Sequence, residues 1–234
     1  MKVLISPVDK EEAIIASNGG ADIVDVKNPK EGSLGANFPW IIKEIKEAVN
    51  GRQPISATIG DFNFKPGTAS LAAFGAAVAG ADYIKVGLYD IQTREQALEL
   101  LTKITRAVKD YDATKKIVAS GYSDYERINS ISPLLLPEVA AEAGVDVVMV
   151  DTAIKDGKST FEFMDEKKLK KFTDLAHEYG LENAIAGSLR FEDLPTLERI
   201  SPDIIGVRGM VCGGDRRTAI QQELVEKLTA ECQA

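Results

Sequence analysis

Four related segments of the sequence carry charged residues at matching positions. The segments are GADIVDVK from Gly20, GADYIKVG from Gly80, GVDVVMVD from Gly144 and SPDIIGVR from Ser201. Each segment contains an aspartate as its third residue. Three places after it, the four segments carry Asp25, Lys85, Met149 and Gly206, and five places after it they carry Lys27, Gly87, Asp151 and Arg208. Side chains alternate between the two faces of a strand, so the third and fifth residues share one face. The segments are therefore predicted to be strands with charge on one face and apolar residues on the other.

Two lysines and two carboxylates in these strands, Lys27, Lys85, Asp25 and Asp151, are the residue types that amine catalysis requires. A lysine attacks a carbonyl group only as the neutral amine, and burial or a neighbouring cation lowers its pKa enough to allow this. The second lysine would supply that cation, and a carboxylate would move protons while the carbinolamine loses water. The alternative interpretation is a network of ion pairs that only seals the end of a barrel, because buried charges are costly unless they are paired.

Glycine-containing loops near these charges are expected to hold an anionic substrate. One strand ends at Gly187 and Ser188, and another ends at Arg208 and Gly209. Backbone N–H groups beside glycine approach a ligand closely, and the loops after the seventh and eighth strands are the usual phosphate site of a barrel. We therefore predict that Gly187, Ser188, Arg208 and Gly209 bind a substrate phosphate, with tight turns alone as the alternative.

Strands and helices alternate along the whole chain. Besides the four charged segments, weaker strands are expected over residues 3–6, 55–59, 117–120 and 184–186. Helical patterns occupy residues 10–17, 40–49, 68–79, 93–109, 136–143, 166–179, 191–198 and 218–231. This alternation predicts an α/β fold, a single (β/α)8 TIM barrel domain over residues 1–234, with the charged segments as its even-numbered strands. An open doubly wound sheet is the alternative, but no G-x-G-x-x-G motif follows the first strand.

The composition excludes several classes of protein and site. With 28 basic and 36 acidic residues the net charge is −8, so a small-molecule substrate is expected as the partner rather than nucleic acid or a membrane surface. Two cysteines without a C-x-x-C motif and a single histidine predict neither a disulfide framework nor a metal site, and no cofactor is expected. The amino terminus MKVLISPVDKEE lacks the apolar core of a signal peptide, which predicts a cytoplasmic protein. Arg216 and Arg217 are expected in solvent or at a contact between subunits of a homo-oligomer.

Three segments that contain the charged residues resemble one known family. They are DVKNPKEGSLG from Asp25, KVG from Lys85 and DTAIKDG from Asp151, and the likeness extends over essentially the whole chain. The sequence resembles the (5-formylfuran-3-yl)methyl phosphate synthase family, also called 4-(hydroxymethyl)-2-furancarboxaldehyde-phosphate synthase. The resemblance implies a class I aldolase-like lyase that makes the furan precursor of methanofuran from two molecules of glyceraldehyde 3-phosphate.

The resemblance also implies a role for individual residues. Lys27 would form the Schiff base and Lys85 would transfer protons, while Asp25, Asp151 and Lys155 would complete the site; Lys155 rests on the resemblance alone. A second triose phosphate needs a second anion site, for which Lys155 or the loop over residues 32–35 is a candidate. Two other functions remain open: an isomerase or epimerase of triose or pentose phosphates without a covalent intermediate, and a non-catalytic protein that binds a phosphate ligand.

Overall fold

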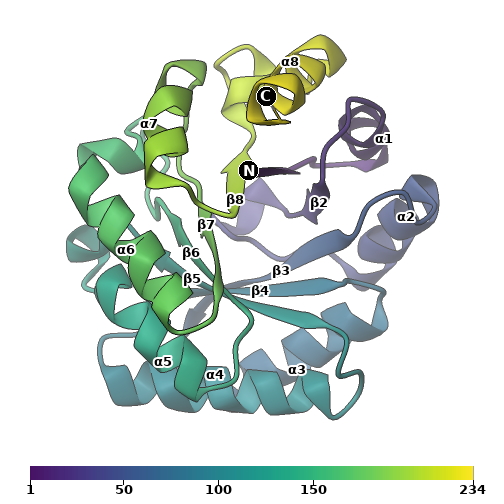
Figure 1. Ribbon diagram of the computed structural model, residues 1–234. Helices are drawn as coiled ribbons and strands as arrows, with labels where there is room; N and C mark the ends of the chain where they lie inside the picture. Colours follow the sequence, from purple (N-terminus) through teal and green to yellow (C-terminus); the bar gives the residue numbers. More distant parts are fainter. Residues whose placement is uncertain (234) are drawn as a thin grey trace.

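Residues 1–233, which the computed structural model describes, contain eight parallel strands that close into a barrel surrounded by helices (Figure 1). The strands are β1 (Lys2–Ile5), β2 (Ile23–Val26), β3 (Ile55–Asn63), β4 (Tyr83–Asp90), β5 (Lys116–Tyr122), β6 (Val147–Asp151), β7 (Glu182–Ile185) and β8 (Ile204–Val207). Each strand pairs with the next, and β8 pairs with β1. The predicted barrel is confirmed, and the four charged segments are its even-numbered strands.

The helices alternate with these strands. They are α1 (Lys10–Asn18), α2 (Pro39–Val49), α3 (Pro66–Val78), α4 (Arg94–Lys109), α5 (Leu136–Glu142), α6 (Glu166–Glu178), α7 (Leu194–Ile200) and α8 (Gln222–Gln233). The helix predicted from residue 218 begins only at Gln222, because the Thr218 hydroxyl donates to the carbonyl oxygens of Cys212 at 2.7 Å and Asp215 at 2.9 Å. Those bonds hold the segment before α8 as a loop beside the end of β8.

The strands separate two apolar cores, as the alternation of their side chains predicts. The outward residues Val24, Ile84 and Val148 are fully buried in the core between the strands and the helices. A smaller core fills the inside of the barrel and contains Leu4, Ile23, Val118, Val147, Met149, Ala184, Ala186 and Ile204. Further along the even-numbered strands, the inward positions carry charge. The barrel is therefore apolar inside near the amino ends of its strands and charged near their carboxyl ends.

The aspartate shared by the four segments has the same bonding at each repeat. Each carboxylate accepts the backbone N–H at or near the start of the preceding odd-numbered strand: Asp22 from Val3 at 2.7 Å, Asp82 from Ile55 at 2.8 Å, Asp146 from Ile117 at 2.7 Å and Asp203 from Asn183 at 2.8 Å. The repeat in the sequence is thus a structural unit of two strands, joined at the amino end of the barrel by one carboxylate.

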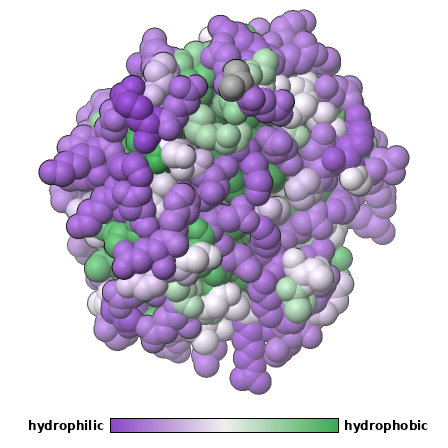
Figure 2. Space-filling model, in the orientation of Figure 1, coloured by the Kyte–Doolittle hydropathy of each residue, from purple (hydrophilic) through white to green (hydrophobic). Residues whose placement is uncertain are grey.

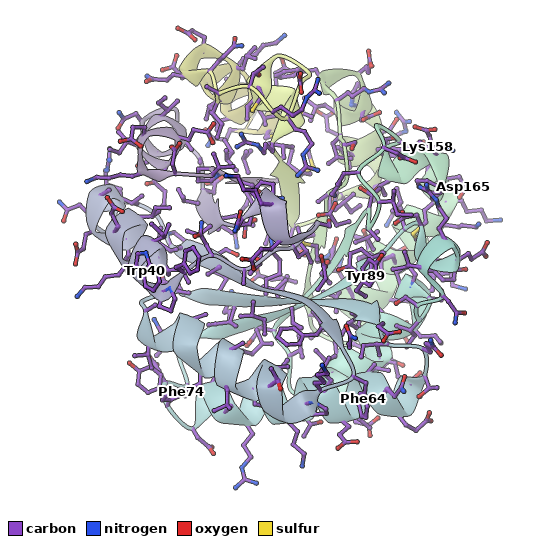
Figure 3. The ribbon with its side chains drawn as sticks, turned by 180° about the vertical axis from the view of Figure 1, so that it is seen from behind. Trp40, Phe64, Phe74, Tyr89, Lys158 and Asp165 are labelled. Carbon is purple, nitrogen blue, oxygen red and sulfur yellow. The ribbon has the colours of Figure 1, made fainter. Side chains whose placement is uncertain are left out.

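Polar side chains cover most of the face shown in Figure 2. Exposed apolar side chains occur on α2 and α3, where Trp40 and Phe74 lie at the outer edge of the barrel (Figure 3) and Leu71 is 74% exposed. Within residues 1–233, no helix is long and apolar enough to cross a bilayer. The expected homo-oligomer stays a prediction, because the structure holds one chain.

Candidate active site

A cavity of about 1140 Å³ opens at the carboxyl ends of the strands. Its lining includes every residue that the sequence predicts for the site: Asp25, Lys27, Lys85, Asp151, Lys155, Gly187, Ser188, Arg208 and Gly209. Asp25 lies on β2, Lys85 on β4 and Asp151 at the end of β6, whereas Lys27 directly follows β2. Alternation along neighbouring strands therefore brings these charges together, as the alignment of the four segments predicts. The role of each residue stays a prediction.

Asp25 and Lys85 form a fully buried ion pair at the floor of this cavity. Nζ of Lys85 lies 2.8 and 2.7 Å from the two carboxylate oxygens, which also accept hydrogen bonds from Ser6 at 3.0 Å and Ser56 at 2.7 Å. Burial by itself raises the pKa of Asp25, but the charges of Lys85 and Lys27 and these hydrogen bonds outweigh it, so the pKa lies below its usual value. Asp25 is therefore a carboxylate, and Lys85 is its partner in the ion pair.

Lys27 differs from the other two lysines of the cavity. Its side chain is buried, and within residues 1–233 its amine has neither a hydrogen bond nor a carboxylate within 4.0 Å. Burial lowers the pKa of Lys27 to about 7; Asp151 and Asp25 oppose this shift, and Lys85 and Lys155 add to it. At neutral pH a large fraction of this lysine is consequently the neutral amine, which is the form that attacks a carbonyl group.

Asp151 and Lys155 form a second ion pair at the rim of the cavity. Nζ of Lys155 lies 2.5 Å from Asp151 and 2.9 Å from the hydroxyl of Thr152, whose backbone N–H donates to the same carboxylate at 2.7 Å. Burial by itself raises the pKa of Asp151, but Lys155, Lys27 and these hydrogen bonds lower it to about 2. Lys155, which no strand alignment places in the site, is therefore part of the same charged cluster.

Gly187 and Ser188 form a tight loop after β7. Both residues have positive φ, +101° and +53°. A Cβ on Gly187 would lie 2.2 Å from Oγ1 of Thr160 and 3.0 Å from the backbone nitrogen of Thr152, so only glycine fits there. In the described part of the chain, the N–H groups of Ser188 and Gly209 have no protein acceptor. Two amides at the cavity wall are thus available to an anion.

Arg208 does not have the free guanidinium that the predicted phosphate contact requires. Its N–H groups donate to the buried carboxylate of Glu12 at 2.6 and 3.2 Å and to the carbonyl oxygens of Ser6 at 2.9 Å, Arg216 at 2.7 Å and Thr218 at 3.2 Å. All five donors of the guanidinium are therefore used. Arg208 braces the loop after β8 against α1, and the sequence carries no signal for its partner, since Glu12 is one of two adjacent glutamates.

Arg216 lies in the cavity wall, where the sequence led us to expect a solvent or subunit contact. Its side chain is partly buried, and within residues 1–233 no hydrogen bond is made by its guanidinium. Burial lowers the pKa of Arg216, Asp151 raises it and Arg208 lowers it further, so these charges are close enough to interact. In contrast to Arg208, Arg216 therefore has guanidinium N–H groups that no acceptor within residues 1–233 uses.

A charged cavity with three lysines lies at the carboxyl end of an eight-stranded parallel barrel, which is where (β/α)8-barrel enzymes have their active sites. The profile of the 4-HFC-P synthase family matches residues 3–229. The (5-formylfuran-3-yl)methyl phosphate synthase of Methanosarcina acetivorans is 87% identical over 233 residues, covering 100% of both chains. The synthase of the same name from Archaeoglobus fulgidus is 60% identical over 97% of each chain. The chain belongs to the (5-formylfuran-3-yl)methyl phosphate synthase family.

Solved structures with the same fold are much more distant in sequence. A crystal structure of 3-hexulose-6-phosphate synthase is similar with a TM-score of 0.68 and 16% identity, over 99% of both chains. Phosphoribosyl anthranilate isomerase from Thermus thermophilus is similar with a TM-score of 0.63 and 16% identity, over 100% of this chain and 98% of that one. These likenesses show the barrel fold and nothing of the reaction.

Proposed function

We propose that this chain condenses two molecules of glyceraldehyde 3-phosphate into (5-formylfuran-3-yl)methyl phosphate through a Schiff base on Lys27, with loss of one phosphate and of water. The product is the furan precursor of methanofuran, and the enzyme acts as a carbon–oxygen lyase. The observation that carries the proposal is the difference between the lysines: Lys85 and Lys155 are each paired with a carboxylate, whereas Lys27 is buried without one and has a pKa near 7. Full-length relatives named for this product support the product, and the nucleophile rests on the lysines alone.

The other charges have roles that follow from their positions. The neutral amine of Lys27 attacks the aldehyde carbon of the first triose, and the carbinolamine loses water to give an iminium ion. The iminium withdraws electrons, so a base can remove the neighbouring proton and the phosphate can leave. Lys85, held by Asp25 below Lys27, and the pair of Asp151 and Lys155 at the rim are the groups within reach to move these protons.

The carbon nucleophile formed in this way adds to the middle carbon of the second triose, which a proton transfer has first converted to its ketone isomer. Ring closure and loss of two molecules of water then give the aromatic furan, which keeps one phosphate, and hydrolysis of the imine releases the aldehyde and the free Lys27 amine. The backbone N–H groups at Ser188 and Gly209 and the guanidinium of Arg216 are the donors that we assign to a phosphate, with Arg208 bracing their loop. Lys155 at the rim is the candidate cation for the second phosphate.

Reduction with borohydride in the presence of glyceraldehyde 3-phosphate tests this proposal. An imine on Lys27 is reduced to a stable secondary amine, and mass spectrometry of a digest locates the adduct. We expect the adduct on Lys27, and none when substrate is omitted. An adduct on Lys85 or Lys155 would move the nucleophile to that residue. Product formation without any adduct would favour a reaction that uses the same carboxylates and no covalent intermediate.

A further inference from the structure

The loop that directly follows Lys27 folds back over the mouth of the barrel. We call residues 28–35 the β2 loop. The backbone N–H of Asn28 donates to the carbonyl oxygen of Gly35 at 2.9 Å, which closes the loop at its base, one residue from Lys27. The side chain of Leu34 is fully buried and packs with Tyr122 and Ala153. A displacement of this loop would therefore move the backbone beside Lys27.

Polar contacts tie the β2 loop to two sides of the barrel. The hydroxyl of Thr58 on β3 donates to the carbonyl oxygens of Leu34 at 2.6 Å and Gly35 at 2.7 Å. The hydroxyl of Ser33 donates to the carbonyl oxygen of Thr152 at 2.8 Å, beyond the end of β6. The backbone N–H of Leu34 donates to Asp61 at 3.2 Å. The other carboxylate oxygen of Asp61 also accepts a hydrogen bond, from a partner side chain that is buried.

That partner is Tyr122 at the end of β5. Its hydroxyl donates to the second carboxylate oxygen of Asp61, and its side chain is fully buried. Burial, the charge and hydrogen bond of Asp61, and the charges of Asp151 and Asp124 raise the pKa of Tyr122 well above its usual value. Tyr122 therefore remains a hydrogen-bond donor throughout the pH range in which the enzyme could work. Within residues 1–233, neither Asp61 nor Tyr122 lines the substrate cavity.

The pair of Asp61 and Tyr122 occupies the space into which a side chain at Gly87 would project. In the alignment of the four strands, the position of Gly87 is the position that carries Lys27, Asp151 or Arg208 on the other strands. A Cβ on Gly87 would lie 2.2 Å from the hydroxyl oxygen of Tyr122, 2.6 Å from Asp61 and 3.0 Å from Leu34. The pair and the β2 loop therefore fill the place of an inward side chain on β4.

We propose that Asp61 and Tyr122 are positioning residues that latch the β2 loop closed and thereby hold the amine of Lys27 in place and out of water. This inference rests on the proposed role of Lys27 as the nucleophile. The carboxylate joins Leu34 of the loop to Tyr122 of the barrel, so loss of either bond weakens the attachment of the loop where it adjoins Lys27. The charged groups that face Lys27 are Asp25, Lys85, Asp151 and Lys155. Substitutions of Asp61 or Tyr122 leave these four residues unchanged.

The substitution Tyr122→Phe tests the latch, because it removes the hydroxyl and keeps the ring. Tyr89→Phe is the matched control: the ring of Tyr89 lies edge-on to that of Tyr122 at 6.1 Å, and its side chain is 38% exposed at the end of β4 (Figure 3). In Tyr122→Phe we expect the backbone amide of Leu34 to exchange with deuterium about tenfold faster, since Asp61 is no longer fixed. Tyr89→Phe should exchange at the rate of the unmodified protein.

The pH dependence of borohydride trapping measures the effect on Lys27. More water at the amine favours its charged form, so the midpoint of trapping should rise by about one pH unit in Tyr122→Phe. Trapping at pH 7 should fall about fivefold and should recover above pH 9. Unchanged exchange at Leu34 would overturn the latch, and faster exchange with an unshifted midpoint would overturn its action on Lys27. An adduct on another lysine would instead refute the proposed nucleophile.

A second variant covers the case in which Tyr122→Phe does not fold. Asp61→Asn keeps an oxygen that can accept the N–H of Leu34 but removes the charge that orders both donors. We expect the same two changes, smaller in size, because the amide oxygen can still accept the N–H of Leu34 while the NH2 group takes the place of the oxygen that accepts from Tyr122. Exchange and trapping that both match the unmodified protein would overturn the proposal.

Discussion

The two ends of the barrel use the same repeat of the sequence in different ways. At the amino end the repeat supplies the same residue four times, since Asp22, Asp82, Asp146 and Asp203 each bond a backbone N–H of a neighbouring strand. At the carboxyl end the corresponding strands carry different residues, and these face a cavity. Identical side chains serve an identical structural need, whereas chemistry needs a different group from each strand.

The charges at the two ends also differ in how they are satisfied. Asp82 accepts the N–H of Ile55 and is paired with Lys46 at 2.5 Å and Lys115 at 3.3 Å. Burial raises the pKa of Asp82, but these contacts outweigh it and lower the pKa below its usual value. Lys27 has no such partner within residues 1–233, and burial lowers its pKa to about 7. The fold stabilises the charge of Asp82 and destabilises that of Lys27, so substitutions at the two ends should have different consequences.

The largest effect is expected from Lys27→Arg. A guanidinium keeps the positive charge but cannot become the neutral amine that forms an imine. Turnover of glyceraldehyde 3-phosphate should fall by more than about 10³-fold, measured as furan product. Lys158→Arg, at an exposed lysine of the loop after β6 (Figure 3), is the matched control and should leave turnover unchanged. Turnover of Lys27→Arg within tenfold of the unmodified enzyme would remove Lys27 from its proposed role.

The two arginines of the loop after β8 separate binding from stability. Arg216→Ala removes a guanidinium without protein partners, so the KM for glyceraldehyde 3-phosphate should rise about 10- to 100-fold with little change in Tm. Arg208→Ala leaves the carboxylate of Glu12 buried without its partner, which should lower the free energy of unfolding by about 3 kcal/mol. Steady-state kinetics and denaturant unfolding of both variants check these outcomes. A rise in KM in Arg208→Ala and not in Arg216→Ala would mean that Arg208, and not Arg216, contacts the phosphate.

Arg208 illustrates which features of the site could be predicted from the sequence and which could not. Alternation along a strand is a local rule, so the inward positions of Asp25, Lys85 and Asp151 could be predicted from four aligned segments. The partners of Arg208 come from α1 and from a loop whose path depends on backbone bonds, so no spacing rule could reveal them.

The latch could not be predicted for a related reason. It depends on β3 continuing to Asn63, beyond its predicted end at residue 59, which brings Asp61 to the mouth of the barrel. Asp61 then meets Tyr122, which is distant in the sequence. The regular strands were therefore predictable from periodicity, whereas the contacts made by the loops that complete the site were not.

Replacing Lys27 should also affect stability, in the opposite direction to activity. The folded pKa of Lys27, about 7, lies below its usual 10.5, so this lysine destabilises the fold in full below pH about 7 and by less and less as pH rises toward 10.5. Lys27→Met should therefore raise the free energy of unfolding at pH 6 by about 2 kcal/mol. The gain should shrink as pH rises toward 10, because the unfolded chain then also begins to carry the neutral amine. Urea unfolding at pH 6 and pH 9.5 measures both values, and a variant less stable at pH 6 would contradict this account.

The smallest effect is expected at the amino end of the barrel, from Asp82→Asn. The amide keeps an acceptor for the N–H of Ile55 but loses the charge that holds Lys46 and Lys115, so the free energy of unfolding at pH 7 should fall by about 1 kcal/mol. The folded pKa of Asp82 is depressed, so its stabilisation is present above the unfolded pKa of about 4 and is lost as pH falls through the lower folded value. The difference between variant and unmodified protein should therefore disappear in acid.

The turnover of Asp82→Asn tests whether the amino end of the barrel serves stability alone. Turnover of glyceraldehyde 3-phosphate should stay within about twofold of the unmodified enzyme, because Asp82 lies at the end of the barrel away from the cavity. Asp174→Asn removes the charge of an exposed carboxylate on α6 that is paired with Lys170, and it should change neither stability nor turnover. A large loss of turnover in Asp82→Asn would mean that the carboxylates at the amino end transmit their effect along the strands to Lys27 and Lys85. The two ends would then be coupled, and the division of stability and chemistry between them would fail.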